Sequence, residues 1–218
     1  MLVVEKKPKS VASESYRTLR TNIQYSSFDK DYQVIMITSS EPGEGKSTTS
    51  ANLALSLAQD EKKVILIDCD LRKPSLHKRF KLSNITGLSD VIIGKEDIIK
   101  AVHRYNKNLA VLTSGKIPPN PSEMLSSKAM TNLIETLRET FDYIILDTPP
   151  VQAVTDSQIL STKADGTILV VRAERTKKEA VKNAVNLLKK VNANIIGTVL
   201  NGLSSDRNKY YYYYGEKK

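Results

Sequence analysis

The sequence predicts a doubly wound α/β domain, in which helices flank a mostly parallel β-sheet. Two observations predict it: short apolar runs that lack apolar-polar alternation, and helical patterns between these runs. Such runs are typical of strands that are buried on both faces, as in a parallel sheet covered by helices. We expect six strands, at residues 34–37, 64–67, 109–112, 143–146, 167–171 and 195–200.

The chain is long enough for one sizeable domain. It has 218 residues and no visible internal repeat or Gly/Ser-rich linker, and domains of about 50 to 200 residues are common. We therefore expect a single domain over residues 1–203. The polar, tyrosine-rich residues 204–218 are expected to form a flexible C-terminal tail.

The first predicted helix covers residues 13–25, ahead of the first strand. Tyr16, Leu19 and Ile23 recur at i, i+3 and i+7, which favours an amphipathic helix. A second side of this helix carries polar residues at i, i+3 and i+6, namely Glu14, Arg17 and Arg20. From spacing alone, these three either pair within the helix or meet another molecule.

A further helix is expected between the last two strands. Thr176 and Glu179 have the spacing of a capping box, and Val181, Val185 and Leu188 follow at i, i+4 and i+7. The lysines of the segment point elsewhere: Lys182, Lys189 and Lys190. This face is either a solvated surface, which is the commoner case, or a surface for an acidic partner or a membrane.

Composition limits the location and the partners of the chain. Lysine and arginine number 33 against 24 aspartates and glutamates, a net charge of +9 that suits nucleic acid, an anionic membrane or a polyphosphate ligand. Aromatic residues make up only 6% and are not interleaved with a basic patch, so nucleic acid is not expected. Because there is no membrane-spanning run, no signal-peptide pattern and only one cysteine, Cys69, we expect a cytoplasmic protein.

A phosphate-binding loop is predicted directly after the first strand. Residues 40–48 match the pattern G-x-x-x-x-G-K-[S/T], except that Ser40 replaces the first glycine. The two glycines of the loop let the backbone approach an anion. Lys46 would bridge the β- and γ-phosphates, and the Ser47 hydroxyl would bind Mg²⁺. The predicted nucleotide-binding residues of the loop are Gly43, Glu44, Gly45, Lys46, Ser47 and Thr48.

Three aspartates stand at the ends of two predicted strands. Asp147 follows an apolar strand and would lie beside the phosphate loop, where such a loop needs an acidic group for its metal. Asp68 and Asp70, at i and i+2, would point to the same side. Two like charges held together favour a shared cation or proton, so we expect metal binding or general-base chemistry. Taken alone, each aspartate could also be an ordinary turn residue.

Together, these motifs resemble those of the bacterial tyrosine kinases, the P-loop protein kinases that govern capsule and exopolysaccharide synthesis. The resemblance covers nearly the whole chain and implies the P-loop NTPase version of the predicted fold. Five segments carry it, in order: 14–20 in the form E-x-x-R-x-x-R, the phosphate loop ending Gly-Lys-Ser-Thr at 45–48, Asp-Cys-Asp-Leu-Arg at 68–72, Asp-Thr-Pro-Pro at 147–150, and the tyrosine run at 210–214.

The resemblance implies transfer of the γ-phosphoryl group of ATP to tyrosine, with Mg²⁺ as the metal. Lys46 would stabilise the developing charge. Ser47, Asp70 and Asp147 would serve Mg²⁺ directly or through water. Asp68 would be the base, with the division of labour between Asp68 and Asp70 left open.

Two further residues receive roles from the same resemblance. Arg72 would steady either the acidic loop or a phosphate. Asn201 follows the last predicted strand, where related ATPases use an asparagine to contact adenine.

The resemblance also implies partners. Glu14, Arg17 and Arg20 match the oligomerisation motif of the family and imply a homo-oligomeric ring. In Gram-positive relatives the kinase is a separate cytoplasmic chain, activated by the cytoplasmic tail of a membrane-spanning partner that recruits it to the inner face of the plasma membrane, and the same arrangement is expected here. Protein substrates in polysaccharide synthesis and a cognate tyrosine phosphatase complete the set.

Half of the ten tyrosines form one unbroken run near the end of the chain: Tyr210, Tyr211, Tyr212, Tyr213 and Tyr214. Tyrosine favours strands, but the preceding residues 204–209 are polar and turn-like. A phosphoacceptor tail is therefore favoured over a buried strand. Residues 201–210 can span at most roughly 30 Å, so the tail could reach an active site, either its own or a neighbour's.

Two other functions are weighed against the kinase. The partitioning and septum-site ATPases share the fold and act as nucleotide-gated assembly switches, but they carry a signature lysine at the second position of the phosphate loop. This chain has Glu41 there, which counts against that function. A non-specific nucleic-acid binder that uses the charge of +9 is a weaker possibility.

Overall fold

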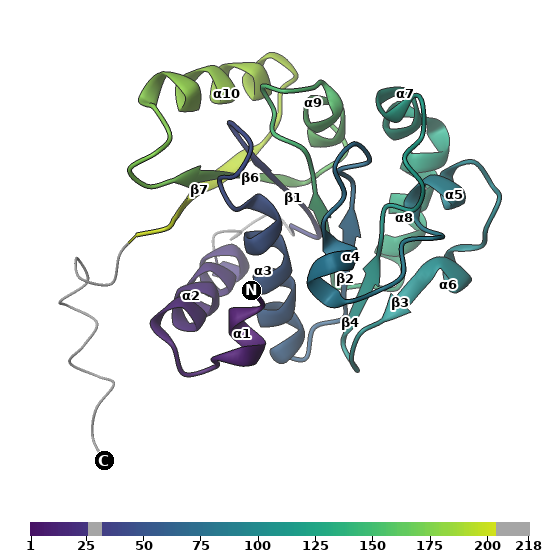
Figure 1. Ribbon diagram of the computed structural model, residues 1–218, viewed down its shortest axis with the longest axis horizontal. Helices are drawn as coiled ribbons and strands as arrows, with labels where there is room; N and C mark the ends of the chain where they lie inside the picture. The colour runs from purple at the N-terminus through teal and green to yellow at the C-terminus, as the bar shows by residue number, and fades with distance from the viewer. Residues whose placement is uncertain (26–31, 204–218) are drawn as a thin grey trace.

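A seven-stranded sheet runs through the structure in the order β3-β4-β2-β5-β1-β6-β7 (Figure 1). The structure is a computed structural model that describes residues 1–25 and 32–203, so the predicted tail at 204–218 and its tyrosine run lie outside the described residues. The strands are β1 (Val34–Ser39), β2 (Val64–Asp68), β3 (Val102–Arg104), β4 (Leu109–Leu112), β5 (Tyr143–Asp147), β6 (Gly166–Arg172) and β7 (Ile195–Asn201).

Six of the strands are parallel and coincide with the six predicted apolar runs, which confirms the doubly wound fold. The seventh, β3, pairs antiparallel with β4 at one edge of the sheet and was not predicted. It has three residues and is only half-buried, because an edge strand is covered on fewer sides than a central one. Its sequence therefore lacks the apolar run that marks the others.

Helices cover both faces of the sheet (Figure 1). One face packs against α1 (Val3–Lys6), α2 (Val11–Tyr25), α3 (Lys46–Gln59) and α4 (Leu76–Phe80). The other packs against α5 (Leu88–Ile92), α6 (Ile98–Ala101), α7 (Pro121–Ser126), α8 (Lys128–Arg138), α9 (Asp156–Ser161) and α10 (Lys178–Lys190). Each face has its own hydrophobic core: the first core lies under α1–α4 and the second lies under α5–α10. Side chains alternate along each strand, so Ile35 and Ile37 lie in the first core while Val34 and Met36 lie in the second. Within the described ranges, no helix is both long and apolar enough to span a lipid bilayer.

The two predicted helices are present, with one correction. The apolar side of α2 faces the domain: Ile23 is buried, and Tyr16 and Leu19 are packed against the first core. The capping box predicted at Thr176 was wrong, because α10 begins only at Lys178 and no side chain caps it. The Thr176 hydroxyl donates instead to the Glu44 carboxylate of the phosphate loop.

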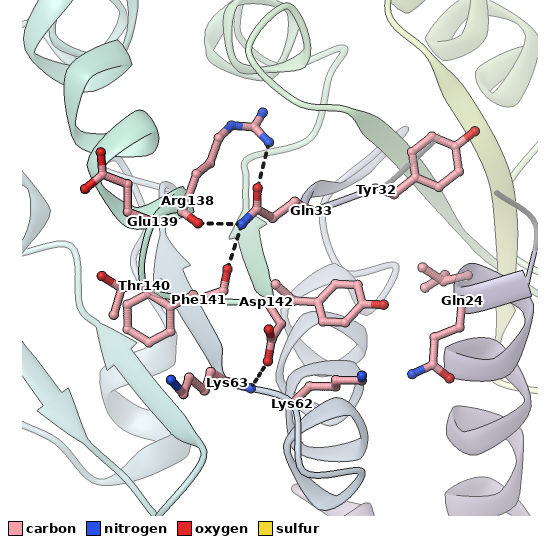
Figure 2. Close-up of a pocket in the computed structure, with 12 residues that line it drawn as sticks. Gln24, Tyr32, Gln33, Lys62, Lys63, Arg138, Glu139, Thr140, Phe141 and Asp142 are labelled. Atoms are coloured by element: carbon pink, nitrogen blue, oxygen red, sulfur yellow. Dashed lines mark hydrogen bonds between the residues drawn. The ribbon is translucent and has the colours of Figure 1, made fainter. Parts of the chain in front are cut away.

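A cavity of about 490 Å³ lies where β1, β2 and β5 begin, at the edge of the sheet opposite the phosphate loop (Figure 2). The Gln33 amide nitrogen donates to the backbone oxygens of Arg138 and Phe141, at 2.8 and 2.7 Å. The Asp142 carboxylate accepts from the Lys63 backbone at 2.7 Å. These hydrogen bonds join the segments before β1, β2 and β5 to one another at this end of the sheet.

Beside this cavity, the Asp165 carboxylate links α8 to the start of β1 through hydrogen bonds. Arg138 donates to both oxygens of its carboxylate, at 2.8 and 2.7 Å, and the backbone of Val34 donates to it at 2.7 Å. Partial burial acts to raise the pKa of Asp165, but the hydrogen bonds from Arg138 and Val34 outweigh it and lower the pKa. The ionised form is therefore the one that stabilises the fold.

We predict that Asp165→Asn destabilises the protein by about 2 kcal/mol at pH 7, because hydrogen bonds to a charged group are lost. A carboxyl whose pKa is lowered by folding contributes its full stabilisation above its unfolded pKa of about 3.9, and this stabilisation is lost as the pH falls from there through the lower pKa of the folded state. The difference in unfolding free energy between wild type and variant should therefore shrink as the pH falls below about 4. Urea denaturation at several pH values measures it, with Glu139→Gln as a control in the same region. A difference that stays constant with pH would contradict this account.

Candidate active site

The predicted phosphate loop lies between β1 and α3, at the carboxyl end of β1. Gly43 and Gly45 have φ angles of +82° and +100°, in the left-handed region that favours glycine. A Cβ at Gly45 would lie 1.8 Å from the amide nitrogen of Asn201, so a larger residue would displace this amide as well as strain the backbone. Ser40 is buried where the chain leaves the strand, and Thr48 is half-buried in the first turn of α3. The loop and the start of α3 together form the geometry of an anion site.

The side chain of Glu44 fastens this loop to its neighbours. It is buried, and its carboxylate accepts hydrogen bonds from the Glu41 backbone at 3.0 Å and from the Thr176 hydroxyl. Its backbone oxygen accepts from the Asn201 amide at 2.9 Å. Of the predicted nucleotide-binding residues, Glu44 therefore offers a ligand only its backbone, and Asn201 already uses its amide nitrogen within the chain.

Lys46 begins α3 and points to the end of β2. Its Nζ lies 3.0 Å from Asp70 Oδ2 and 3.4 Å from the Ser47 hydroxyl, and only 13% of the lysine side chain is exposed. Burial acts to lower the pKa of Lys46, but the charges of Asp147 and Asp70 outweigh it and raise the pKa. The lysine is thus held protonated at the acidic edge.

Asp147 ends β5 and is fully buried. One carboxylate oxygen accepts from the Ser50 hydroxyl at 3.0 Å, whereas Oδ2 is buried without a hydrogen-bond partner among the described residues. Burial raises the pKa of Asp147, although the charge of Lys46 opposes it. A buried carboxylate oxygen without a partner is costly, and a cation or an ordered water would satisfy it.

Asp68 lies directly beside Asp147, because the two are paired in the β2–β5 register. Its Oδ2 accepts from the backbones of Ser75 and Leu76 at 3.0 and 2.9 Å, and within the described ranges its Oδ1 accepts only from the Asp70 backbone, at 3.3 Å. Burial, followed by the charge of Asp147, raises the pKa of Asp68 to about 7. The sheet thus brings the three predicted aspartates and Lys46 together at one edge.

These residues fit a magnesium ion that is shared with phosphates. No three His, Cys, Asp or Glu side chains in the described part of the chain are arranged to hold a metal by themselves. Mg²⁺ is usually bound through one or two carboxylates, waters and substrate phosphates. The open oxygen of Asp147, with Asp70 and the Ser47 hydroxyl nearby, provides such a partial set.

Arg72 contacts two helices on the other face of the sheet. Its guanidinium donates to both oxygens of Asp156 at the start of α9, at 2.9 and 3.1 Å, and to the Ser122 hydroxyl at 3.0 Å. It therefore ties the loop after β2 to α9 and α7.

Sequence reasoning missed Ser50, which donates to Asp147. Its only signal in the sequence is its place four residues after Lys46, on the side of α3 that faces the sheet.

The N-terminal motif pairs within its own chain. Arg17 lies 2.7 Å from Glu14 and donates to the backbone oxygen of Pro8 at 2.7 Å, while Arg20 donates to the backbone oxygen of Ser56 at 2.8 Å. The pairing within the helix that spacing allowed is thus present. Whether the same residues also meet a second subunit stays a prediction.

Comparison with known proteins gives the site its context. Residues 32–200 match the family described as an AAA domain. The tyrosine-protein kinase YwqD of Bacillus subtilis (strain 168) is 49% identical over 211 residues, which cover 96% of this chain and 89% of that protein.

Solved structures agree with this assignment. The crystal structure of the chimerical protein CapA2B2 has a TM-score of 0.88 and 41% identity, covering 91% of this chain and 88% of that one. The kinase domain of Escherichia coli tyrosine kinase ETK has a TM-score of 0.90 and 34% identity, covering 93% and 80%. The comparisons confirm the resemblance and do not favour the assembly-switch alternative. The chain therefore belongs to the bacterial tyrosine kinases, a group of protein-tyrosine kinases built on a P-loop domain.

Proposed function

We propose that this protein uses ATP and Mg²⁺ to phosphorylate tyrosines, including its own run Tyr210–Tyr214, and that it thereby regulates capsule or exopolysaccharide synthesis and export. The observation that carries the proposal is the meeting of Lys46, Asp70 and Asp147 at the mouth of the phosphate loop, at 3.0 Å between Lys46 and Asp70. Transfer of a phosphoryl group requires that the reacting groups be positioned and that negative charge be compensated, and this arrangement of charged side chains suits both requirements.

The phosphate loop binds and orients the triphosphate. Backbone N–H groups of residues 43–48 face the anion, and Gly43 and Gly45 let it come close. Lys46 exchanges its contact with Asp70 for the β- and γ-phosphates and stabilises the charge that develops on the transferred group. Bound Mg²⁺ neutralises charge on the phosphates. Ser47, Asp70 and Asp147 would hold it, directly or through water.

Asp68 is the proposed base, which takes the proton from the tyrosine hydroxyl. Support comes from its Oδ1, whose only hydrogen bond among the residues that the structure describes is long, at 3.3 Å, and from its place beside Asp147. Arg72, by holding Asp156, keeps the loop of Asp68 and Asp70 in position. Transfer moves the γ-phosphoryl group from the leaving ADP oxygen to the tyrosine oxygen.

The family also supports an assembly around this chemistry. Glu14, Arg17 and Arg20 would join subunits in a ring, so that one subunit's tail meets its neighbour's site. The cytoplasmic tail of a membrane-spanning partner would activate the kinase and hold it at the inner face of the plasma membrane. Proteins of polysaccharide synthesis would be substrates, and a cognate tyrosine phosphatase would reverse the reaction.

Lys46→Met should abolish phosphotyrosine at Tyr210–Tyr214. Loss of one group that stabilises transition-state charge costs on the order of 10²–10³-fold in rate. Mass spectrometry of protein incubated with Mg·ATP and the partner's cytoplasmic tail measures the modification, with Lys182→Met as a matched control on the surface of α10. If wild-type protein that binds ATP never acquires phosphotyrosine, the proposed function is wrong.

Asp147→Asn should separate metal binding from folding. Without nucleotide we expect the variant to melt at the same temperature as wild type or slightly higher, because a buried charge with an unpaired oxygen is removed. Mg·ADP should stabilise wild type and leave the melting temperature of the variant nearly unchanged. Thermal melts with and without Mg·ADP, with Glu179→Gln as the control, measure both effects. Equal stabilisation of the two proteins by Mg·ADP would argue against a metal role for Asp147.

Glu14→Ala combined with Arg17→Ala should shift the protein from ring to monomer. The double variant keeps the net charge and leaves the contacts of Arg20 with the domain in place. Light scattering after size-exclusion chromatography measures the mass, with Lys9→Ala as the control. A monomeric wild type, or an unchanged mass in the double variant, would contradict the assembly role.

A further inference from the structure

The loop that follows β6 places an arginine against the phosphate loop. A Cβ at Gly43 would lie 3.4, 3.7 and 3.8 Å from Nη1, Nη2 and Cζ of Arg175. Because both Nη atoms lie nearer than Cζ, the guanidinium turns its Nη edge toward the glycine, at van der Waals contact distance. Arg175 is exposed, and it forms no ion pair within the described ranges, so its guanidinium is accessible to a ligand.

Several contacts hold Arg175 in this position. The next residue, Thr176, donates its hydroxyl to Glu44 of the phosphate loop and accepts a hydrogen bond from the Arg172 backbone at 3.0 Å. The preceding residue, Glu174, has a φ of +62°, a conformation that a non-glycine residue adopts only where its surroundings impose it. Arg175 therefore sits on a turn that is fixed to the phosphate loop.

The order of the strands says which end of a nucleotide would meet this arginine. Lys46, Asp70 and Asp147 gather beside β2 and β5, which lie on one side of β1, whereas β6 and β7 lie on the other. A nucleotide that rests on the loop with its terminal phosphate at the acidic edge must extend its nucleoside in the opposite direction. Arg175 follows β6 and Asn201 ends β7, so both lie on that side.

We infer that Arg175 binds the nucleoside end of ATP, with the adenine base stacked on its guanidinium. The inference rests on the proposed function, since it requires a bound nucleotide, and it names a binding residue that sequence reasoning did not. A guanidinium is planar and weakly hydrated, and it stacks well on flat π-systems. Asn201, whose amide donates to Glu44 and packs on Gly45, is then a positioning residue for the loop, and Arg175 takes the base contact.

The test compares ligands with and without a base. Calorimetry with Mg²⁺ measures the affinity of ADP and of inorganic tripolyphosphate for wild type, Arg175→Ala and Arg175→Lys. A stacking contact with one base is worth roughly five- to a hundredfold in affinity. We expect both variants to bind ADP about tenfold more weakly and tripolyphosphate within twofold of wild type. Lys182→Ala, which removes one positive charge from α10, should bind both ligands as wild type does.

Three results would overturn the inference. An equal loss for ADP and tripolyphosphate would mean that Arg175 contacts phosphate. Unchanged binding of ADP to Arg175→Ala would mean that it contacts nothing. Wild-type affinity in Arg175→Lys would mean that charge, without the planar group, is enough. In each of these cases wild type still binds ADP, whereas a wild type that does not bind ADP would contradict the proposed kinase itself.

Discussion

An excess of buried negative charge controls the architecture of this site. Asp68, Asp70 and Asp147 are all nearly or fully buried at one edge of the sheet, with Lys46 as the cation among them. Burial acts to raise the pKa of both Asp68 and Asp147, so the fold bears a cost for keeping them ionised. Such a cluster persists when it has a partner from outside the chain, and a divalent cation with its phosphates meets that need.

The rest of the edge keeps the cluster in place. Asp68 is held by backbone N–H groups of the loop that follows β2, and Arg72 ties the same loop to Asp156 on the opposite face of the sheet. On the other side of β1, Glu44 links the phosphate loop to the segments after β6 and β7. The phosphate loop is thus clamped between two parts of the sheet, so its N–H groups are oriented before any phosphate arrives. This kind of preorganisation makes electrostatic stabilisation effective.

How much of this was predictable depends on whether the signal is local. The six parallel strands followed from apolar runs, and the aspartates followed from their places at strand ends. β3 was missed because a three-residue, half-buried edge strand has no apolar run. The capping box at Thr176 failed because its hydroxyl has a competing partner 132 positions away, Glu44. Arg175 gave no signal either, since its role depends on a contact with Gly43 that only the fold creates.

The two glycines of the phosphate loop show how local pattern and distant contact combine. The motif requires glycine at position 45, whereas Gly43 occupies one of its variable positions, and both residues have φ angles in the left-handed region that favours glycine. At Gly45 the fold adds a second requirement, because a Cβ there would lie 1.8 Å from the amide nitrogen of Asn201. A side chain at position 45 would displace that amide as well as strain the backbone, whereas a Cβ at position 43 would meet Arg175 only at van der Waals distance and would strain the backbone alone. Gly45 therefore serves the phosphates on one side of the loop and the contact with Asn201 on the other, and the second role cannot be read from the motif.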